Sequence, residues 1–184
     1  MNKKEIFNDL KYDLQSINSS ANERLIKEEQ VRSSIFSSLR KQGFYVAAER
    51  NYNNHSEIEC DLVFWKDGES ESWMEIKTSR YSEVKDKRQL DKNKKNTWNN
   101  NPKEQFNSWK KDLQKLKNQN KKNISKFFVL IEQCNENSLY DKIISENKYE
   151  NSEMLQELKQ DNFEFELVWR KAPVNKCIIR IFSL

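Results

Sequence analysis

Only two glycines, Gly43 and Gly68, occur among the 184 residues of this chain. Loops that cradle the phosphates of a nucleotide, such as G-x-G-x-x-G and the P-loop, need several glycines within one short segment. Two widely separated glycines form neither loop, so nucleotide-binding folds of those kinds are excluded. Each glycine instead suits a backbone turn. Gly43 follows a helical pattern, where a left-handed cap favours glycine, and Asp67-Gly68 is a pair typical of a hairpin turn.

The use of histidine and cysteine excludes further classes of site. The chain has one histidine, His55, and three cysteines, Cys60, Cys134 and Cys177, with no C-x-x-C pair. This pattern suits neither a zinc site nor a disulfide framework, and it predicts a reducing, cytoplasmic setting. The chain begins without the apolar segment of a signal peptide, and its longest purely apolar run, 127–131, is too short to span a membrane. We therefore expect no membrane partner.

The spacing of apolar residues predicts an α/β chain with the order α-α-β-β-β-α-β-α-β-β, and the length suits one domain. Helices are expected over 3–17, about 22–42 and 101–118, with helical pieces near 138–160. Strands are expected over 44–50, 57–65, 72–78 and 126–132, and in a carboxy-terminal hairpin of 163–170 and 176–183. The turn at Asp67-Gly68 makes the second and third strands neighbours in the sheet.

Three charged residues are expected on one face of these two strands. Glu75 and Lys77 point to the same face because side chains alternate along a strand, whereas Ile76 takes the other face. Asp61, in the second strand, opposes them if the register permits. Unpaired charges among buried apolar residues are costly, and a metal ion held by the carboxylates would remove that cost.

The second helix supplies a further carboxylate. When each residue advances by about 100°, Glu28 falls inside the apolar stripe that contains Ile35 and Leu39, and Glu29 falls at its margin. We therefore expect Glu28, rather than Glu29, to reach toward the sheet that carries Asp61.

Together these residues resemble the signature of the PD-(D/E)XK nuclease superfamily. The similar elements are a helix glutamate (Glu28), an aspartate on the second strand (Asp61) and E-x-K on the third strand (Glu75 and Lys77). The resemblance implies an α/β fold with a mixed sheet and a restriction-endonuclease-like αβββαβ core over about 22–132. The helix within residues 1–20 would then be an appendage. Residues 21–184 would form a single domain, in which the last helix and β-hairpin extend the core.

Two further segments are similar to particular branches of that superfamily. LRKQGFYVAAER, at 39–50, resembles the start of small Holliday-junction resolvases and Mrr-like endonucleases, and Gln105-Phe-Asn-Ser-Trp109 resembles the Q-x-x-x-Y element of the RecB-like branch. Trp109 replaces the tyrosine of that element, and Cys60 replaces the proline that precedes the signature aspartate. The resemblance places Gln105 among the catalytic residues, although an ordinary residue in the first turn of a helix explains it equally well.

The resemblance implies a metal-dependent nuclease of the restriction, repair or defence type that hydrolyses phosphodiester bonds in DNA. Asp61, Glu75 and the carbonyl of Ile76 would hold Mg²⁺ or Mn²⁺, since hard cations prefer oxygen ligands. Lys77 would orient or help to deprotonate the attacking water, and Glu28 would complete the outer shell or bind a second ion.

Positive charge is concentrated in one segment of the chain. Residues 80–126 contain 15 Lys or Arg and 5 Asp or Glu, whereas the rest of the chain has an excess of six negative charges. Such a basic, Asn-rich stretch attracts a phosphate backbone, although a solvated loop explains the composition equally well. The residues expected to contact nucleic acid are Arg80, Lys85, Lys87, Arg88, Lys92, Lys94 and Lys95.

Two functional interpretations remain open. The chain is either an active nuclease or a catalytically silent domain of the same fold that binds nucleic acid or a protein partner. The pattern D-x13-E-x-K is weak by itself, because charged chains contain it by chance. A double-strand cut needs two active sites, so the nuclease interpretation also predicts a homodimer.

Overall fold

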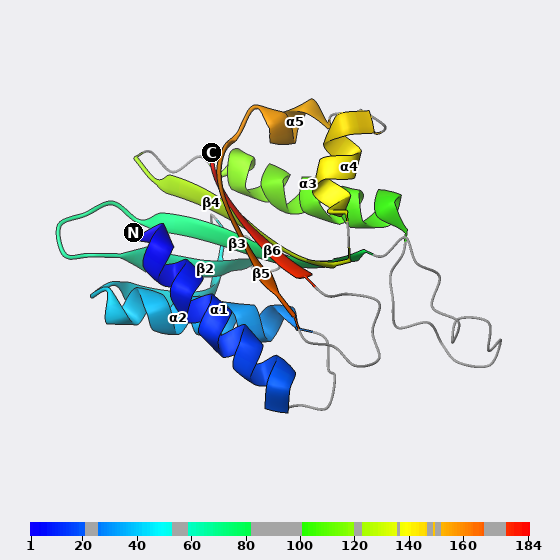
Figure 1. Cartoon of the computed structure of the whole chain (residues 1–184). Coiled ribbons are helices and arrows are strands. Elements are labelled where there is room, and N and C mark those ends of the chain that lie inside the picture. The colour runs from blue at the N-terminus through cyan, green and yellow to red at the C-terminus, as the bar shows by residue number, and fades with distance from the viewer. Residues whose placement is uncertain are drawn as a thin grey trace.

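The computed structural model describes residues 1–20, 26–52, 59–81, 101–119, 123–135, 137–146, 149, 152–167 and 176–184. In these ranges the chain is mixed α/β, with a six-stranded mixed sheet of order β1-β2-β3-β4-β6-β5 (Figure 1). The strands are β1 (Tyr45–Asn51), β2 (Glu59–Trp65), β3 (Ser72–Tyr81), β4 (Ser125–Cys134), β5 (Lys159–Glu166) and β6 (Lys176–Ser183). β3 and β4 are parallel, and the other neighbouring strands are antiparallel.

Helices cover both faces of the sheet. They are α1 (Lys3–Ser20), α2 (Glu28–Lys41), α3 (Pro102–Asn118), α4 (Leu139–Glu146) and α5 (Glu153–Gln156). α1 and α2 pack on one face, and α3, α4 and α5 pack on the other (Figure 1). β3 contributes Met74 and Ile76 to the core beneath α1 and α2, and Trp73 to the opposite core, as its alternation predicted.

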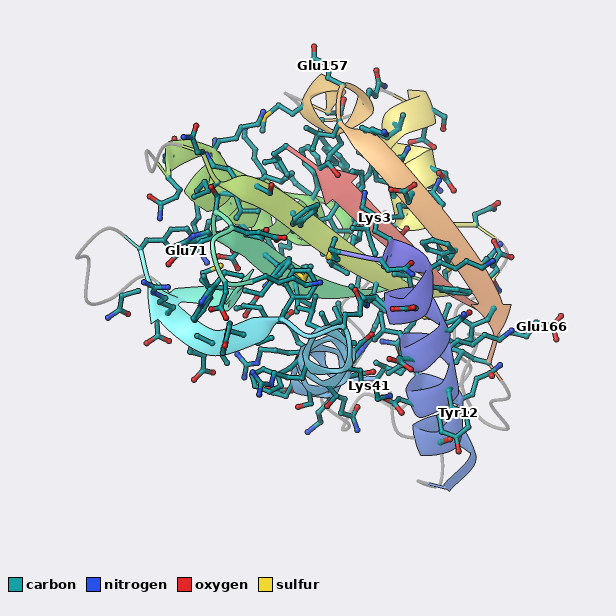
Figure 2. All side chains as sticks on the ribbon, turned by 90° about the vertical axis from the view of Figure 1, so that its left-hand side faces the viewer. Lys3, Tyr12, Lys41, Glu71, Glu157 and Glu166 are labelled. Atoms are coloured by element: carbon teal, nitrogen blue, oxygen red, sulfur yellow. The ribbon has the colours of Figure 1, made fainter. Side chains whose placement is uncertain are left out.

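The first helix and the last two strands belong to this architecture. Ile6, Leu10 and Leu14 of α1 are fully buried in the core that α2 also covers. Phe7 of α1 stacks on Phe163 of β5 with ring centroids 4.4 Å apart. Figure 2 shows α1 lying along β5, with Lys3 at the end nearer the sheet and Tyr12 directed outward. β6 lies between β4 and β5, so the carboxy-terminal strand is internal to the sheet.

Both glycines adopt a left-handed backbone conformation, as their positions after a helix and in a hairpin turn predicted. The φ angles of Gly43 and Gly68 are 81° and 76°, in the left-handed region that favours glycine. The expected start of α3 is also present, because Asn101 is the N-cap, its side chain accepts a hydrogen bond from the Glu104 N–H, and Pro102 is the first helical residue.

The expected start of the second helix was wrong. α2 begins at Glu28 rather than near residue 22, and Ile26 and Lys27 lie before it in a non-helical conformation. Two contacts accompany this start: the Gln30 side chain caps the helix by accepting from the Lys27 N–H, and the side-chain amide of Gln133 on β4 hydrogen-bonds to the backbone N–H and C=O of Ile26. Those two backbone groups are thereby taken out of the helical pattern.

Other boundaries also differ from the expected ones. α1 continues to Ser20 instead of ending at residue 17, and the helical pieces expected near 138–160 are the two short helices α4 and α5. β5 starts at Lys159, within the segment expected to be helical, and ends at Glu166 rather than at residue 170. Its length matches β6, since the pairing runs from Lys159 opposite Ser183 to Glu166 opposite Lys176.

Two findings concern the cysteines and the length of the helices. Cys60, Cys134 and Cys177 are buried and free of disulfide bonds. Among the helices that the structure describes, none has both the length and the apolar character needed to cross a membrane.

Candidate active site

The paired strands β2 and β3 bring Asp61 next to Glu75 and Ile76 of β3. Leu62 pairs with Met74 and Val63 with Trp73, and the same register places Asp61 opposite Glu75. Here the Asp61 side chain also bonds to β3: its Oδ2 accepts a hydrogen bond from the Ile76 N–H at 2.7 Å. The carboxylate of Asp61 is thus held against β3 by the residue between Glu75 and Lys77.

Arg32 of α2 balances part of the charge of Asp61. Its Nη1 atom lies 3.6 Å from Asp61 Oδ1 and 2.8 Å from Oε1 of Glu49 on β1. Glu49 has a φ of 53°, which is unusual for a residue other than glycine, and it interrupts the regular geometry of the edge strand β1 beside Asp61.

Glu75 is a buried carboxyl group with few partners. Its residue is 3% exposed, its Oε1 accepts a hydrogen bond from the Tyr52 hydroxyl at 2.8 Å, and Lys115 Nζ lies 3.9 Å from the same oxygen. Burial, and next the negative charge of Asp61, raise the pKa of Glu75 to about 9, against the opposing effects of Lys115 and Tyr52. Lys115 does not offset the effect of burial, so the Glu75 carboxyl group stays protonated at neutral pH unless a further cation binds next to it.

Lys77 is held between two carboxylates from two helices. Its Nζ lies 3.0 Å from Asp112 Oδ2 on α3 and 3.4 Å from Glu28 Oε2 on α2. Burial by itself lowers the pKa of Lys77, but Asp112 and Glu28 outweigh that effect, so the net pKa is raised. The ammonium group is therefore both charged and fixed in position.

Glu28 reaches the sheet, as its place in the apolar stripe predicted. Besides contacting Lys77, its Oε2 accepts a hydrogen bond from the Thr78 N–H at 3.3 Å, whereas Glu29 is exposed. Burial raises the pKa of Glu28, and the Lys77 ammonium opposes that shift.

Sequence reasoning missed Asp112, which is buried and forms ion pairs with two lysines. Its Oδ1 lies 2.8 Å from Lys115 Nζ, and its Oδ2 forms the ion pair with Lys77. Oδ2 has no hydrogen bond of good geometry in the described part of the chain, so ion pairing alone balances its charge. The signal was available, since Asp112 lies at the edge of the apolar stripe of α3, as Glu28 lies within that of α2.

Gln105 fastens the first turn of α3 to the end of β3. Its Oε1 accepts a hydrogen bond from the Arg80 N–H at 3.1 Å, and its Nε2 donates to the Arg80 carbonyl at 2.8 Å. The Ser79 hydroxyl also hydrogen-bonds to Oε1. Trp109, one turn further along α3, is 1% exposed and packs in the core.

A cleft of about 200 Å³ adjoins this arrangement between β3 and α3. Lys77 and the half-buried Arg80 line it, together with Ser108 and Gln105. Arg80 is the one expected nucleic-acid contact within the described ranges. The other expected contacts, Lys85, Lys87, Arg88, Lys92, Lys94 and Lys95, lie outside them, as does His55.

Asp61 and Glu75 are the carboxyl groups of the site that could hold a hard cation. Asp61 and Glu75 lie close enough for the charge of Asp61 to raise the pKa of Glu75, and a divalent ion between them would remove that repulsion. Within the part of the chain that the structure describes, no three or more His, Cys, Asp or Glu side chains are grouped to hold a metal. Mg²⁺ commonly uses only one or two carboxylates together with water and substrate phosphate.

Comparison of the chain with protein-family models, with curated proteins and with solved structures found no match. The site is therefore interpreted from its own geometry. It joins Glu28 of α2, Asp61 of β2, Glu75 and Lys77 of β3, and the Asp112–Lys115 pair of α3.

Proposed function

We propose that this chain is a metal-dependent nuclease with a restriction-endonuclease-like core that hydrolyses phosphodiester bonds in DNA. The observation that carries the proposal is the placement of Lys77. Its ammonium group is fixed by Asp112 and Glu28, two residues along β3 from the buried carboxyl group of Glu75 and beside Asp61. Carboxylates that hold a metal ion and a fixed cation can together promote phosphodiester hydrolysis.

Asp61, Glu75 and the main-chain oxygen of Ile76 would hold Mg²⁺ or Mn²⁺. When bound, the cation supplies Lewis-acid activation of the phosphodiester. Lys77 would donate hydrogen bonds to the attacking water or to the phosphoryl oxygens on which negative charge develops, because its ion pairs favour the protonated form. Glu28 would keep Lys77 in place from the side of α2, and it is also available to bind a second ion.

The cleft beside Lys77 supports a nucleic-acid substrate. Arg80 and Lys77 line it with two positive charges and Glu104 with one negative charge, and the basic segment that follows Arg80 in sequence would extend the attraction for phosphates. Cutting both strands of a duplex needs two such sites, so the proposal includes a homodimer.

The proposal is tested by titrating Mn²⁺ into the wild-type protein calorimetrically and by incubating the protein with supercoiled plasmid in Mg²⁺ or Mn²⁺. We expect Asp61→Ala to lose metal binding and nicking together, and Lys77→Ala to lose nicking while retaining most metal binding. Glu29→Ala is the matched control, because Glu29 is an exposed carboxylate next to Glu28. Plasmid cleavage that persists in both site variants would contradict the proposal.

A silent binding domain is the second candidate, and one observation favours it. Each acid of the site already has a cationic partner within the chain, with Lys77 near Glu28, Lys115 near Glu75 and Arg32 near Asp61. Such a domain would bind DNA in a salt-dependent manner without taking up Mn²⁺ and without nicking plasmid. The same two measurements therefore separate the candidates.

A further inference from the structure

Lys115 belongs to the candidate site, but the chemistry described so far gives it no part, and it gives Asp112 only the part of fixing Lys77. One carboxylate, that of Asp112, pairs with two lysines from different elements, Lys77 through Oδ2 at 3.0 Å and Lys115 through Oδ1 at 2.8 Å. Both lysines are therefore held at a separation that a single carboxylate group determines.

The two lysines and the carboxylate differ in their access to solvent. The side chain of Asp112 is 6% exposed, whereas those of Lys77 and Lys115 are 23% and 26% exposed. The carboxylate thus lies beneath two ammonium groups that still reach the surface. Since an ammonium group has three N–H donors, each lysine keeps donors for a ligand after pairing with Asp112.

Lys115 also faces the carboxyl group that would bind the metal. Its Nζ lies 3.9 Å from Glu75 Oε1, beyond hydrogen-bond distance, so the contact is electrostatic. A phosphodiester held near Glu75 by a cation would come within reach of both lysines. Its two non-bridging oxygens gain negative charge during hydrolysis, and two fixed cations match them.

We propose that Lys115 is a second cationic catalytic residue that contacts the scissile phosphate, and that Asp112 is a positioning residue that holds Lys115 and Lys77 as a pair. The inference rests on the nuclease function proposed above. It differs from a purely structural explanation, in which Lys115 only neutralises Asp112 and Glu75. In that case, removing Lys115 would lower stability and leave the rate of cleavage unchanged.

The test is single-turnover cleavage of plasmid DNA in Mg²⁺, measured over a range of protein concentrations that separates the maximal rate from half-saturation. We expect Lys115→Gln to lower the maximal rate by about 100-fold, as loss of one preorganised donor does in other enzymes. Half-saturation should change little, and Lys115→Arg should restore part of the rate. Lys111→Gln, an exposed lysine on the same helix, is the matched control and should cleave like the wild type.

The outcomes distinguish this inference from the nuclease proposal. If the wild type cleaves and Lys115→Gln cleaves equally fast, the inference is overturned and the nuclease proposal stands. If the wild type does not cleave, both are overturned. Asp112→Asn should lower the maximal rate as well, and combining it with Lys115→Gln should cost less than the product of the two single effects, because both act through the same pair. Should Asp112→Asn fail to fold, the comparison of Lys115→Gln with Lys115→Arg still decides the question.

Discussion

The side-chain amide of Gln133 makes two hydrogen bonds with the backbone of Ile26, accepting from its N–H at 2.9 Å and donating to its C=O at 3.0 Å. Gln133 is fully buried on β4, and Ile26 lies just before α2. This pair, together with the cap in which the Gln30 side chain accepts from the Lys27 N–H, fits a start of α2 at Glu28, which lies beside Lys77 and Thr78.

Replacement of Gln133 should destabilise the fold. Gln133→Leu would leave the N–H and C=O of Ile26 without partners in a buried place, which typically costs about 1–3 kcal/mol. Urea denaturation measures the loss, and Gln114→Leu, at an exposed position on α3, is the control that should change the free energy of unfolding by less than about 0.5 kcal/mol. Equal stability of the two variants would show that the Gln133–Ile26 contact contributes little.

The raised pKa of Glu75 predicts a pH-dependent effect of Glu75→Gln on the metal-free protein. The folded-state pKa is about 9 and the ordinary value is 4.5, so between these values the unfolded chain releases a proton that the folded chain retains. The wild type should lose stability as pH rises through this range, by up to about 1.4 kcal/mol per pH unit from this group.

Gln cannot ionise and can still accept the hydrogen bond from Tyr52, so Glu75→Gln should be more stable than the wild type at pH 8 and similar to it near pH 4.5. Thermal unfolding at several pH values in the presence of a chelator measures the difference. Glu29→Gln is the exposed control and should show no such trend. A constant difference between Glu75→Gln and the wild type across this range would contradict the raised pKa.

Substitution of Asp61 should separate stability from metal binding. Asp61→Asn keeps an oxygen that can accept from the Ile76 N–H, and it removes the negative charge that pairs with Arg32 and that a metal ion would need. We expect the metal-free variant to differ from the wild type by less than about 1 kcal/mol near pH 7, where Glu75 is protonated, and to bind no Mn²⁺ in a calorimetric titration. Asp67→Asn, in the exposed turn before Gly68, is the control and should bind Mn²⁺ normally. Tight Mn²⁺ binding by Asp61→Asn would remove Asp61 from the set of ligands.

A buried ion pair away from the site should be essential to the fold. Arg180 Nε lies 3.2 Å from Glu132 Oε2, and the two residues are 4% and 1% exposed. Arg180→Met would leave Glu132 charged and buried, and should cost about 3–5 kcal/mol. The double variant Arg180→Met with Glu132→Gln should recover most of that loss, because the Gln carbonyl oxygen can accept from the Tyr140 N–H while its amide nitrogen donates to the Ser138 hydroxyl oxygen.

The control for this pair is Lys176→Met, which breaks the more exposed ion pair with Glu164 and should cost less than about 1 kcal/mol. Chemical denaturation of the four proteins checks the order. If the double variant were no more stable than Arg180→Met, the cost would not come from the unpaired carboxylate of Glu132.

Several residues of the candidate site could be predicted from local patterns in the sequence. Side-chain alternation predicted that Glu75 and Lys77 lie on one face of β3, and the Asp67-Gly68 turn predicted that β2 is its neighbour. Helical periodicity predicted that Glu28 points toward the sheet. Each of these inferences concerns residues close together in the chain, where backbone geometry alone relates their positions.

The interaction partners of these residues could not be predicted from the sequence in the same way. Asp112 meets Lys77 because α3 packs on the face of the sheet from which Lys77 projects, and Gln105 turned out to bind the backbone of Arg80. Their distances from β3 depend on how one helix lies against the sheet, and side-chain periodicity along either element carries no information about that placement.

The sequence by itself determined which residues can be carboxylate and lysine partners, which faces of β3 and α2 they occupy, and where glycine permits a turn. Only the tertiary structure decided which of them meet, which side chain holds Ile26 before α2 and how far β5 extends. The physical reason is the range of the interactions. Dihedral preferences and side-chain periodicity act between near neighbours in the chain, whereas the contacts of Gln133 with Ile26 and of Asp112 with Lys77 form only when distant segments pack together.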